Sequence, residues 1–157
     1  FRPLRQRRAR PRQWILCPDP GPAGRRRDSG SRGGDPGAGW FPHVVGFADE
    51  TGTGAGAGAT LNVPLAPESG DAPWLVAVTR LVDVVRDQGS TALVVSLGVD
   101  AAAEDPESPL RVSVDGYGRA GELLHGLGLP SVMVQEGGYH LESLGGLVRA
   151  FVERFPA

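Results

Sequence analysis

Two polar side chains follow apolar runs of the kind that form buried strands. Asp100 comes shortly after residues 91–98, TALVVSLG, and Tyr139 comes directly after residues 131–138, SVMVQEGG. Because the carboxyl ends of parallel strands open on one edge of a sheet, we expect Asp100 and Tyr139 to face the same site. A carboxylate can bind zinc or another divalent metal, and a tyrosine hydroxyl can donate a hydrogen bond to an oxyanion. On spacing alone, capping of a turn by Asp100 and packing of Tyr139 are the more common roles.

Glycines occur next to this tyrosine and in a second run. Gly137 and Gly138 allow a tight backbone turn that leaves Tyr139 free to point into a cleft. The run TGTGAGAGAT, residues 51–60, suggests a nucleotide-binding α/β protein as one alternative. A phosphate-binding loop, however, has G-x-G-x-x-G or G-x-x-x-x-G-K-[ST] spacing and opens a helix. This run has neither spacing, and it leads into LNVPL, which has the pattern of a strand.

The remaining patterns supply the elements that must position these residues. Apolar residues at helical spacing alternate with short β-branched runs, which predicts an α/β domain with a mostly parallel sheet, right-handed crossovers and strands buried on both faces. Asp71 and Asp115 are expected to cap the first two helices. The predicted strands are residues 59–65, 91–98 and 131–138, and the predicted helices are 71–88, 115–127 and 141–155.

Composition divides the chain into two unlike parts. Residues 1–32 hold ten of the 16 basic residues, all of them Arg, and are rich in Pro and Gly. We expect this segment to be disordered, and a nucleic-acid-binding arm is an unfavoured alternative because no aromatic residues interleave the charges. The single Cys17 excludes an intramolecular disulfide, and no apolar run is long enough to span a membrane or to form a secretory signal. A cytoplasmic protein is therefore expected.

Three collinear segments resemble a known enzyme family. GFADETGTGAGAGATLNVPL, ALVVSLGVDAAAEDP and VMVQEGGYHLESLG resemble the zinc-dependent histone deacetylase and acetylpolyamine amidohydrolase family, and look closer to its acetylpolyamine and bacterial branch. The resemblance covers about residues 33–157, which would be the C-terminal portion of the family domain. It implies a three-layer arginase/deacetylase-like α/β fold, incomplete at the N-terminus, and hydrolysis of an acetylpolyamine or acetyl-lysine substrate. It implies neither a nucleic-acid nor a membrane partner, and leaves oligomerisation open.

The resemblance assigns roles to individual residues. Asp100 matches the aspartate that supplies one of three protein ligands to Zn²⁺, and Tyr139 matches the tyrosine that polarises the acetyl carbonyl. Gly137 and Gly138 match glycines that line the substrate tunnel. Asp105-Pro106 matches the Asp-Pro that usually follows the ligand loop.

Other residues of the family site have no counterpart here. The sequence GGDP at residues 33–36 matches the family's His-Gly-Asp-Pro and places the expected Asp-x-His ligands near residues 8–14, which read RARPRQW. The upstream His-His pair is also absent, so we expect this chain alone to be inactive, and we interpret residues 1–32 as a frameshifted or wrongly joined segment. The alternative is a non-enzymatic remnant or interaction module with a basic tail.

The three histidines do not replace these ligands. His43 is a possible contact at the substrate rim. We expect His125 and His140 to have structural or solvent-exposed positions.

Overall fold

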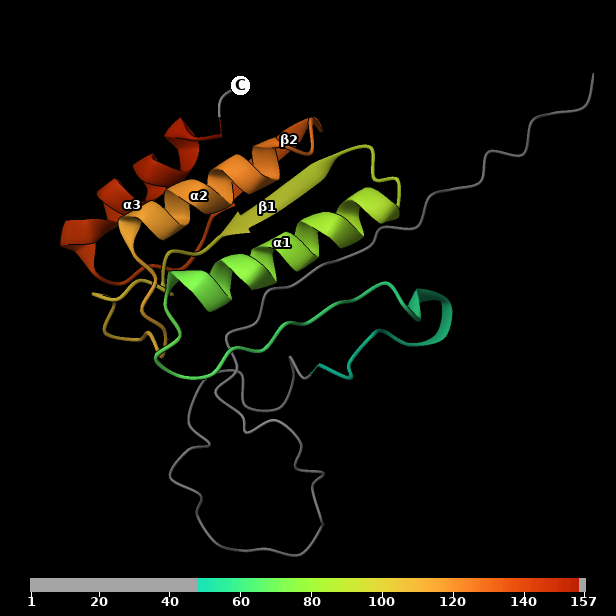
Figure 1. Cartoon of the computed structure of the whole chain (residues 1–157), viewed down its shortest axis with the longest axis horizontal. Coiled ribbons are helices and arrows are strands. Elements are labelled where there is room, and N and C mark those ends of the chain that lie inside the picture. Colours follow the sequence, from blue (N-terminus) through green and yellow to red (C-terminus); the bar gives the residue numbers. More distant parts are fainter. Residues whose placement is uncertain (1–47, 156–157) are drawn as a thin grey trace, which may run out of the picture.

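The computed structural model describes residues 48–155, and these form one α/β unit (Figure 1). The predictions for residues 1–32 and for His43 lie outside the described residues. The elements are a 3₁₀ helix η1 (Gly54–Gly56), α1 (Asp71–Asp87), β1 (Leu93–Leu97), α2 (Val114–His125), β2 (Ser131–Gln135) and α3 (Leu141–Glu153). None of the helices within this part of the chain is long and apolar enough to cross a membrane.

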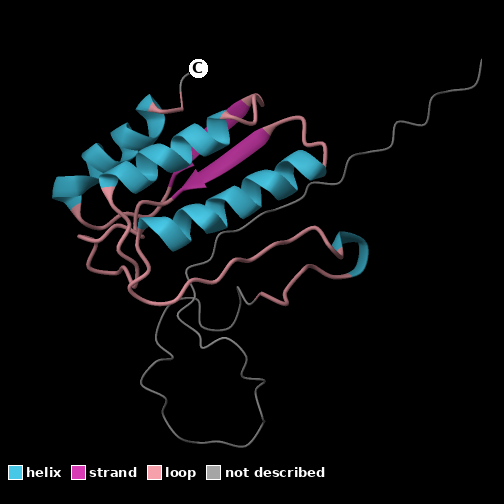
Figure 2. Cartoon of the chain, viewed as in Figure 1, coloured by secondary structure: helices cyan, strands magenta, loops and turns pink. Residues whose placement is uncertain are grey.

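The two strands form a parallel pair, as the sequence predicts. β1 and β2 pair in register from Leu93 opposite Ser131 to Leu97 opposite Gln135. The connection between them runs through α2, which passes in front of β2 in Figure 2. A parallel pair joined through a helix directs both strands the same way, so that both carboxyl ends lie at one edge.

Helices cover one face of this sheet. Side chains from α1, α2 and α3 pack with the β1 and β2 residues that point toward them into a single apolar core, which includes Val78, Val82, Val95, Leu97, Tyr117, Ala120, Met133, Leu147 and Phe151. The rings of Trp74 and Tyr117 join α1 to α2, with centroids 5.0 Å apart. Gly121 lets α2 approach α3 closely, since a Cβ at this position would collide with the backbone carbonyl of Phe151.

The opposite face of the sheet is exposed within residues 48–155. Val94 is 70% exposed, Val132 is 59% exposed and Val134 is 46% exposed. The prediction that both strands are buried on both faces is therefore wrong for the described part of the chain. The physical reason is that α1, α2 and α3 all contribute to the core on the other face, and no other described element covers these valines.

The predicted strand over residues 59–65 is also wrong. This segment is extended but forms no ladder, although Asn62 and Leu65 are buried. A strand needs a partner for its N–H and C=O groups, and no described segment pairs with it. Pro64 in addition lacks the N–H that a central strand would donate.

Neither aspartate predicted to cap a helix does so. The N-cap of α1 is Gly70, and the Asp71 carboxylate accepts hydrogen bonds from the backbone N–H (2.7 Å) and hydroxyl (2.6 Å) of Ser113. Ser113 is itself the N-cap of α2, and its hydroxyl accepts from the backbone N–H three residues later. Asp115 instead pairs with Arg154, the residue that follows α3, at 2.8 Å. Both carboxylates therefore connect elements rather than end them.

The glycine run at residues 51–60 forms a compact loop. The backbone N–H of Thr60 donates to the carbonyl of Thr51 at 3.3 Å, and Gly52, Gly54 and Gly58 adopt positive φ. The three-residue η1 is the only helix in this loop, and the segment that follows is extended. This geometry agrees with the rejection of a phosphate-binding loop.

The exposed valines lead to a prediction about self-association. We expect the 157-residue chain to self-associate through the face that carries Val94, Val132 and Val134. Association would remove these exposed apolar side chains from water. The triple variant V94T/V132T/V134T keeps the shape and strand propensity of these side chains, and should raise the monomer fraction in sedimentation velocity without changing the far-UV circular dichroism. The control V95T alters the core-facing side and should instead destabilise the fold. A wild-type chain that is monomeric at the same concentration would contradict the prediction.

Candidate functional site at the carboxyl edge of the sheet

Backbone pairing continues beyond the ends of both strands. The N–H of Glu136 donates to the carbonyl of Leu97 at 3.0 Å, and the N–H of Val99 donates to the carbonyl of Gly137 at 2.8 Å. The loop that holds Asp100 is thereby aligned with the loop that leads to Tyr139. We call these two loops, residues 98–105 and 136–140, the strand-end site. The structure thus brings together two segments that the sequence separates by a whole helix.

The Asp100 carboxylate occupies a space that two glycines leave open. A Cβ at Gly98 would lie 2.7 Å from Asp100 Oδ1, and a Cβ at Gly137 would lie 2.6 Å from its Cγ. Either side chain would force the carboxylate to move. Gly137 therefore has a role at Asp100 itself, and Gly98 is a site residue that the sequence reasoning missed. Its only signal was a glycine at the end of an apolar strand, two positions before the aspartate.

The environment of Asp100 opposes its ionisation. Partial burial is the main factor that raises the pKa of this carboxyl, and the negative charges of Asp105 and Glu136 raise it further. A hydrogen bond with its own backbone N–H acts in the opposite direction. Carboxyls that are kept near other acids in spite of this penalty are frequent at functional sites.

Gly138 turns the chain toward Tyr139. Its φ of +142° lies in a region that L side chains rarely adopt. A Cβ there would also meet Val99 Cγ2 at 2.6 Å and Leu144 Cδ1 at 2.8 Å. The predicted tight turn is therefore present, and both its φ and its contacts require glycine. That Gly137 and Gly138 line a substrate tunnel stays a prediction.

Tyr139 is anchored through its backbone while its side chain reaches solvent. The residue is 59% exposed, and its N–H donates to Asp105 Oδ2 at 2.6 Å. His140 follows as the N-cap of α3, and its Nδ1 lies 2.9 Å from Ser143 Oγ. A fixed backbone with an accessible phenol is suited to donating a hydrogen bond to a bound carbonyl oxygen.

The buried Tyr117 bonds to the loop of the strand-end site that holds Asp100. It is 1% exposed, and its Oη accepts a hydrogen bond from the N–H of Ala101 at 3.2 Å. Burial raises the pKa of the Tyr117 hydroxyl well above its usual range, so that it is neutral at physiological pH. The sequence identified Tyr117 only as part of an apolar helix stripe, because nothing local indicates that its hydroxyl reaches the residue after Asp100.

The described residues do not form a metal site among themselves. Within residues 48–155 no group of three or more His, Cys, Asp or Glu side chains is arranged to hold a metal ion. A catalytic zinc site uses three protein ligands and one open position. Asp100 can supply one carboxylate, so the described part of the chain does not by itself fit a zinc site.

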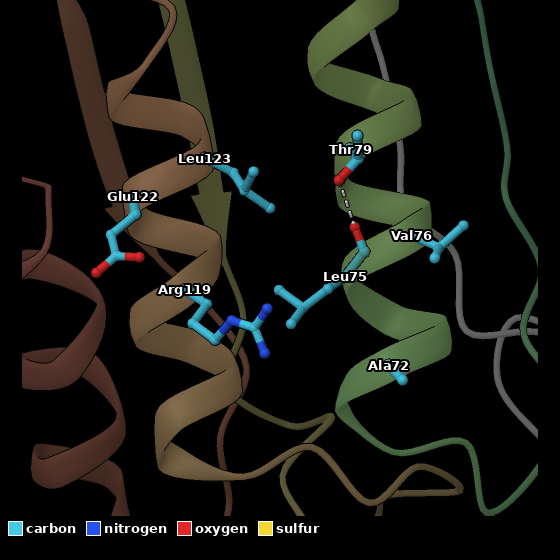
Figure 3. Close-up of a pocket in the computed structure, with 7 residues that line it drawn as sticks. All are labelled: Ala72, Leu75, Val76, Thr79, Arg119, Glu122 and Leu123. Atoms are coloured by element: carbon cyan, nitrogen blue, oxygen red, sulfur yellow. Dashed lines mark hydrogen bonds between the residues drawn. The ribbon is translucent and has the colours of Figure 1, made fainter.

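The structure has a separate hollow on its helical layer. A groove of about 520 Å³ lies between α1 and α2 and is lined by Ala72, Leu75, Val76, Thr79, Arg119, Glu122 and Leu123 (Figure 3). None of the predicted site residues lines it. The groove is therefore distinct from the strand-end site.

Comparison with known proteins identifies the family. Residues 35–155 match the histone deacetylase domain. The chain belongs to the histone deacetylase family. It is 44% identical to the acetylpolyamine amidohydrolase of Burkholderia pseudomallei over 124 aligned residues. The alignment covers 79% of this chain and 36% of that protein. It is 42% identical to acetylpolyamine amidohydrolase 2 of Pseudomonas aeruginosa, over 67% of this chain and 30% of that protein.

Solved structures agree with this assignment. The crystal structure of the Burkholderia pseudomallei acetylpolyamine aminohydrolase superposes with a TM-score of 0.72 at 43% identity, over 75% of this chain and 34% of that one. The HDA15 HD domain superposes with a TM-score of 0.70 at 30% identity, over 76% of this chain and 34% of that one. The predicted arginase/deacetylase-like α/β fold is confirmed, and the chain spans about a third of the length of these relatives.

The raised pKa of Asp100 leads to a prediction about stability and pH. A carboxyl with a folded-state pKa above its ordinary value of 3.8 contributes stability below that pH, and this contribution is lost as pH rises through the folded-state pKa. Asp100→Asn should therefore raise the midpoint of urea unfolding at pH 7 in the presence of a chelator, and the gain should vanish below about pH 3.8. Asp115→Asn, which removes an exposed ion-paired carboxylate, should give no gain. An Asp100→Asn variant that is no more stable than wild type at pH 7 would refute this.

A second prediction concerns the support from Tyr117. Tyr117→Phe keeps the ring against Trp74 but leaves the Ala101 N–H without its acceptor, and should lower the free energy of unfolding by about 1–3 kcal/mol. Tyr139→Phe also removes a tyrosine hydroxyl, but from an exposed ring, and should leave the free energy of unfolding unchanged. Equal effects of the two substitutions in urea unfolding would show that the Tyr117 hydroxyl has no such role.

Proposed function

We propose that this chain contributes the C-terminal part of a deacetylase domain that hydrolyses an acetylated amine. The observation that carries the proposal is the strand-end site. Two loops that hold Asp100 and Tyr139 are fixed side by side in a chain that belongs to the histone deacetylase family. This juxtaposition places at one edge a carboxylate, which can bind a divalent metal, and an accessible phenol, which can donate a hydrogen bond to an amide carbonyl oxygen.

The relatives support a proposal for the substrate class. Four proteins named acetylpolyamine amidohydrolase match at 40–44% identity, whereas Arabidopsis thaliana histone deacetylase 8 matches at 35%. This order favours an acetylated polyamine over an acetyl-lysine side chain as the substrate of the complete domain. In both cases the bond broken is an amide between an acetyl group and an alkyl amine.

Each site residue has a proposed part in this reaction. The Tyr139 hydroxyl donates a hydrogen bond to the acetyl carbonyl oxygen, and the interaction strengthens as negative charge develops there. Gly137 and Gly138 keep the approach to this hydroxyl free of side chains. In the complete domain Asp100 would be one ligand of a Zn²⁺ ion, whose other ligands the described residues do not supply.

A chimera provides the experiment. Residues 35–155 of this chain replace the matching segment of the Burkholderia pseudomallei acetylpolyamine amidohydrolase, and hydrolysis of an acetylated diamine is measured. We expect turnover, a fall in kcat of about 10²- to 10³-fold in Tyr139→Phe, and loss of both zinc and activity in Asp100→Ala. Arg149→Gln, at an exposed position on α3, is the control and should leave kcat unchanged. A folded chimera in which Tyr139→Phe retains full turnover would contradict the proposed role of Tyr139.

The 157-residue chain alone should behave differently. We expect it to bind less than one equivalent of zinc and to show no hydrolysis of the same substrate, because a single carboxylate is a poor zinc site. Metal analysis and a product assay on the purified chain test this. Stoichiometric zinc together with turnover would overturn the prediction and would require further ligands from residues 1–47.

A further inference from the structure

We propose that Asp105 is a positioning residue that fixes Tyr139 against the loop of Asp100. The importance of this position for catalysis rests on the proposed function of Tyr139. The geometry itself does not, and it can be measured without substrate or metal. The sequence offered Asp105 only as the first half of an Asp-Pro pair.

The Asp105 carboxylate is buried, and both of its oxygens accept hydrogen bonds from backbone donors. The residue is 5% exposed. Its Oδ2 accepts from the N–H of Tyr139 at 2.6 Å and from that of His140 at 3.3 Å, and its Oδ1 accepts from the N–H of Glu107 at 3.0 Å. Hydrogen bonds to an ionised acceptor are roughly twice as strong as neutral ones, so this carboxylate is a strong anchor for the backbone of Tyr139.

Asp105 also supplies an acceptor at the start of α3. The N-cap of α3 is His140, which makes no capping hydrogen bond through its side chain. The first N–H groups of a helix need acceptors, and a negative charge near them is favourable. Asp105 supplies both from a loop 35 residues earlier in the chain. The loop of Asp100 therefore helps to place the start of α3, and with it Tyr139.

The loop that holds Asp105 is itself tightly fixed. The N–H of Asp105 donates to the carbonyl of Ala102 at 3.1 Å, and Ala102 is completely buried. The N–H of Val112 donates to the carbonyl of Ala101 at 3.1 Å, which closes the loop on the chain that leads into α2. Because backbone hydrogen bonds fix this loop, the Asp105 carboxylate holds the backbone of Tyr139 at a defined position relative to Asp100.

The composition of the chain allows a selective test. It contains only two tyrosines, Tyr117 and Tyr139, so uniform 3-fluorotyrosine labelling of the full 157-residue chain gives two ¹⁹F signals, which Tyr139→Phe assigns. Asp105→Asn should shift the Tyr139 signal and move that of Tyr117 less. The amide of Tyr139 should exchange with solvent about tenfold faster than in wild type, while the amides of Val99 and Glu136 keep their protection.

Asp71→Asn is the matched control. Asp71 is also a carboxylate that accepts a backbone N–H at the start of a helix, in its case that of Ser113. This substitution should leave the Tyr139 signal in place, whereas Tyr117, which lies in the helix that Asp71 contacts, is free to shift. A Tyr139 signal and amide that are unchanged in Asp105→Asn, or that change equally in Asp71→Asn, would overturn the proposal.

If Asp105→Asn does not fold, amide exchange in the wild-type chain tests the positioning role of Asp105. The Tyr139 amide of wild type should then be protected from exchange despite the exposure of its side chain. Exchange at the rate of an unprotected amide would overturn the proposal. Failure of the chimera to turn over substrate, with these signals as expected, would refute the proposed function and leave the positioning role of Asp105 intact.

Discussion

The structure depends on the parallel register of β1 and β2, and above all on its continuation past the strands. Two backbone hydrogen bonds, from Glu136 to Leu97 and from Val99 to Gly137, align the loops that follow. A shift of one residue would turn the core-facing side chains to the opposite face and separate Asp100 from the Tyr139 loop. The three helices on one face of the sheet keep this register, because the side chains that they bury, such as Val95 and Leu97, alternate with exposed ones.

The loops at this edge retain features that do not favour stability. The Asp100 carboxyl is partly buried close to two other acids, and only the absence of side chains at Gly98 and Gly137 makes room for it. Asp105 compensates in part, since its own charge is satisfied by three backbone N–H groups. A carboxyl held at a site that disfavours its charge is typical of sites selected for function, and this chain belongs to the histone deacetylase family.

Much of this organisation could be predicted from the sequence, and the exceptions have physical reasons. Periodicity and glycine stops gave all three helices and both strands of the ladder, because these signals are local. The roles of Asp71 and Asp115 were missed because both bond to residues that are distant in sequence. The segment at 59–65 has the pattern of a strand, but a strand also needs a neighbouring segment for its backbone hydrogen bonds, and the local pattern does not show whether one is present. At the site, residue type and strand position indicated Asp100 and Tyr139, whereas the anchoring by Asp105 exists only once the chain has folded.

Backbone hydrogen bonds beyond the strands hold the loops of Asp100 and Tyr139 together. Scalar couplings across hydrogen bonds, measured by NMR on the isotopically labelled chain, test this directly. We expect couplings from the amide nitrogen of Val99 to the carbonyl carbon of Gly137, and from that of Glu136 to that of Leu97. Couplings confined to the strands, with none at these two pairs, would contradict this by showing that the loops are not joined.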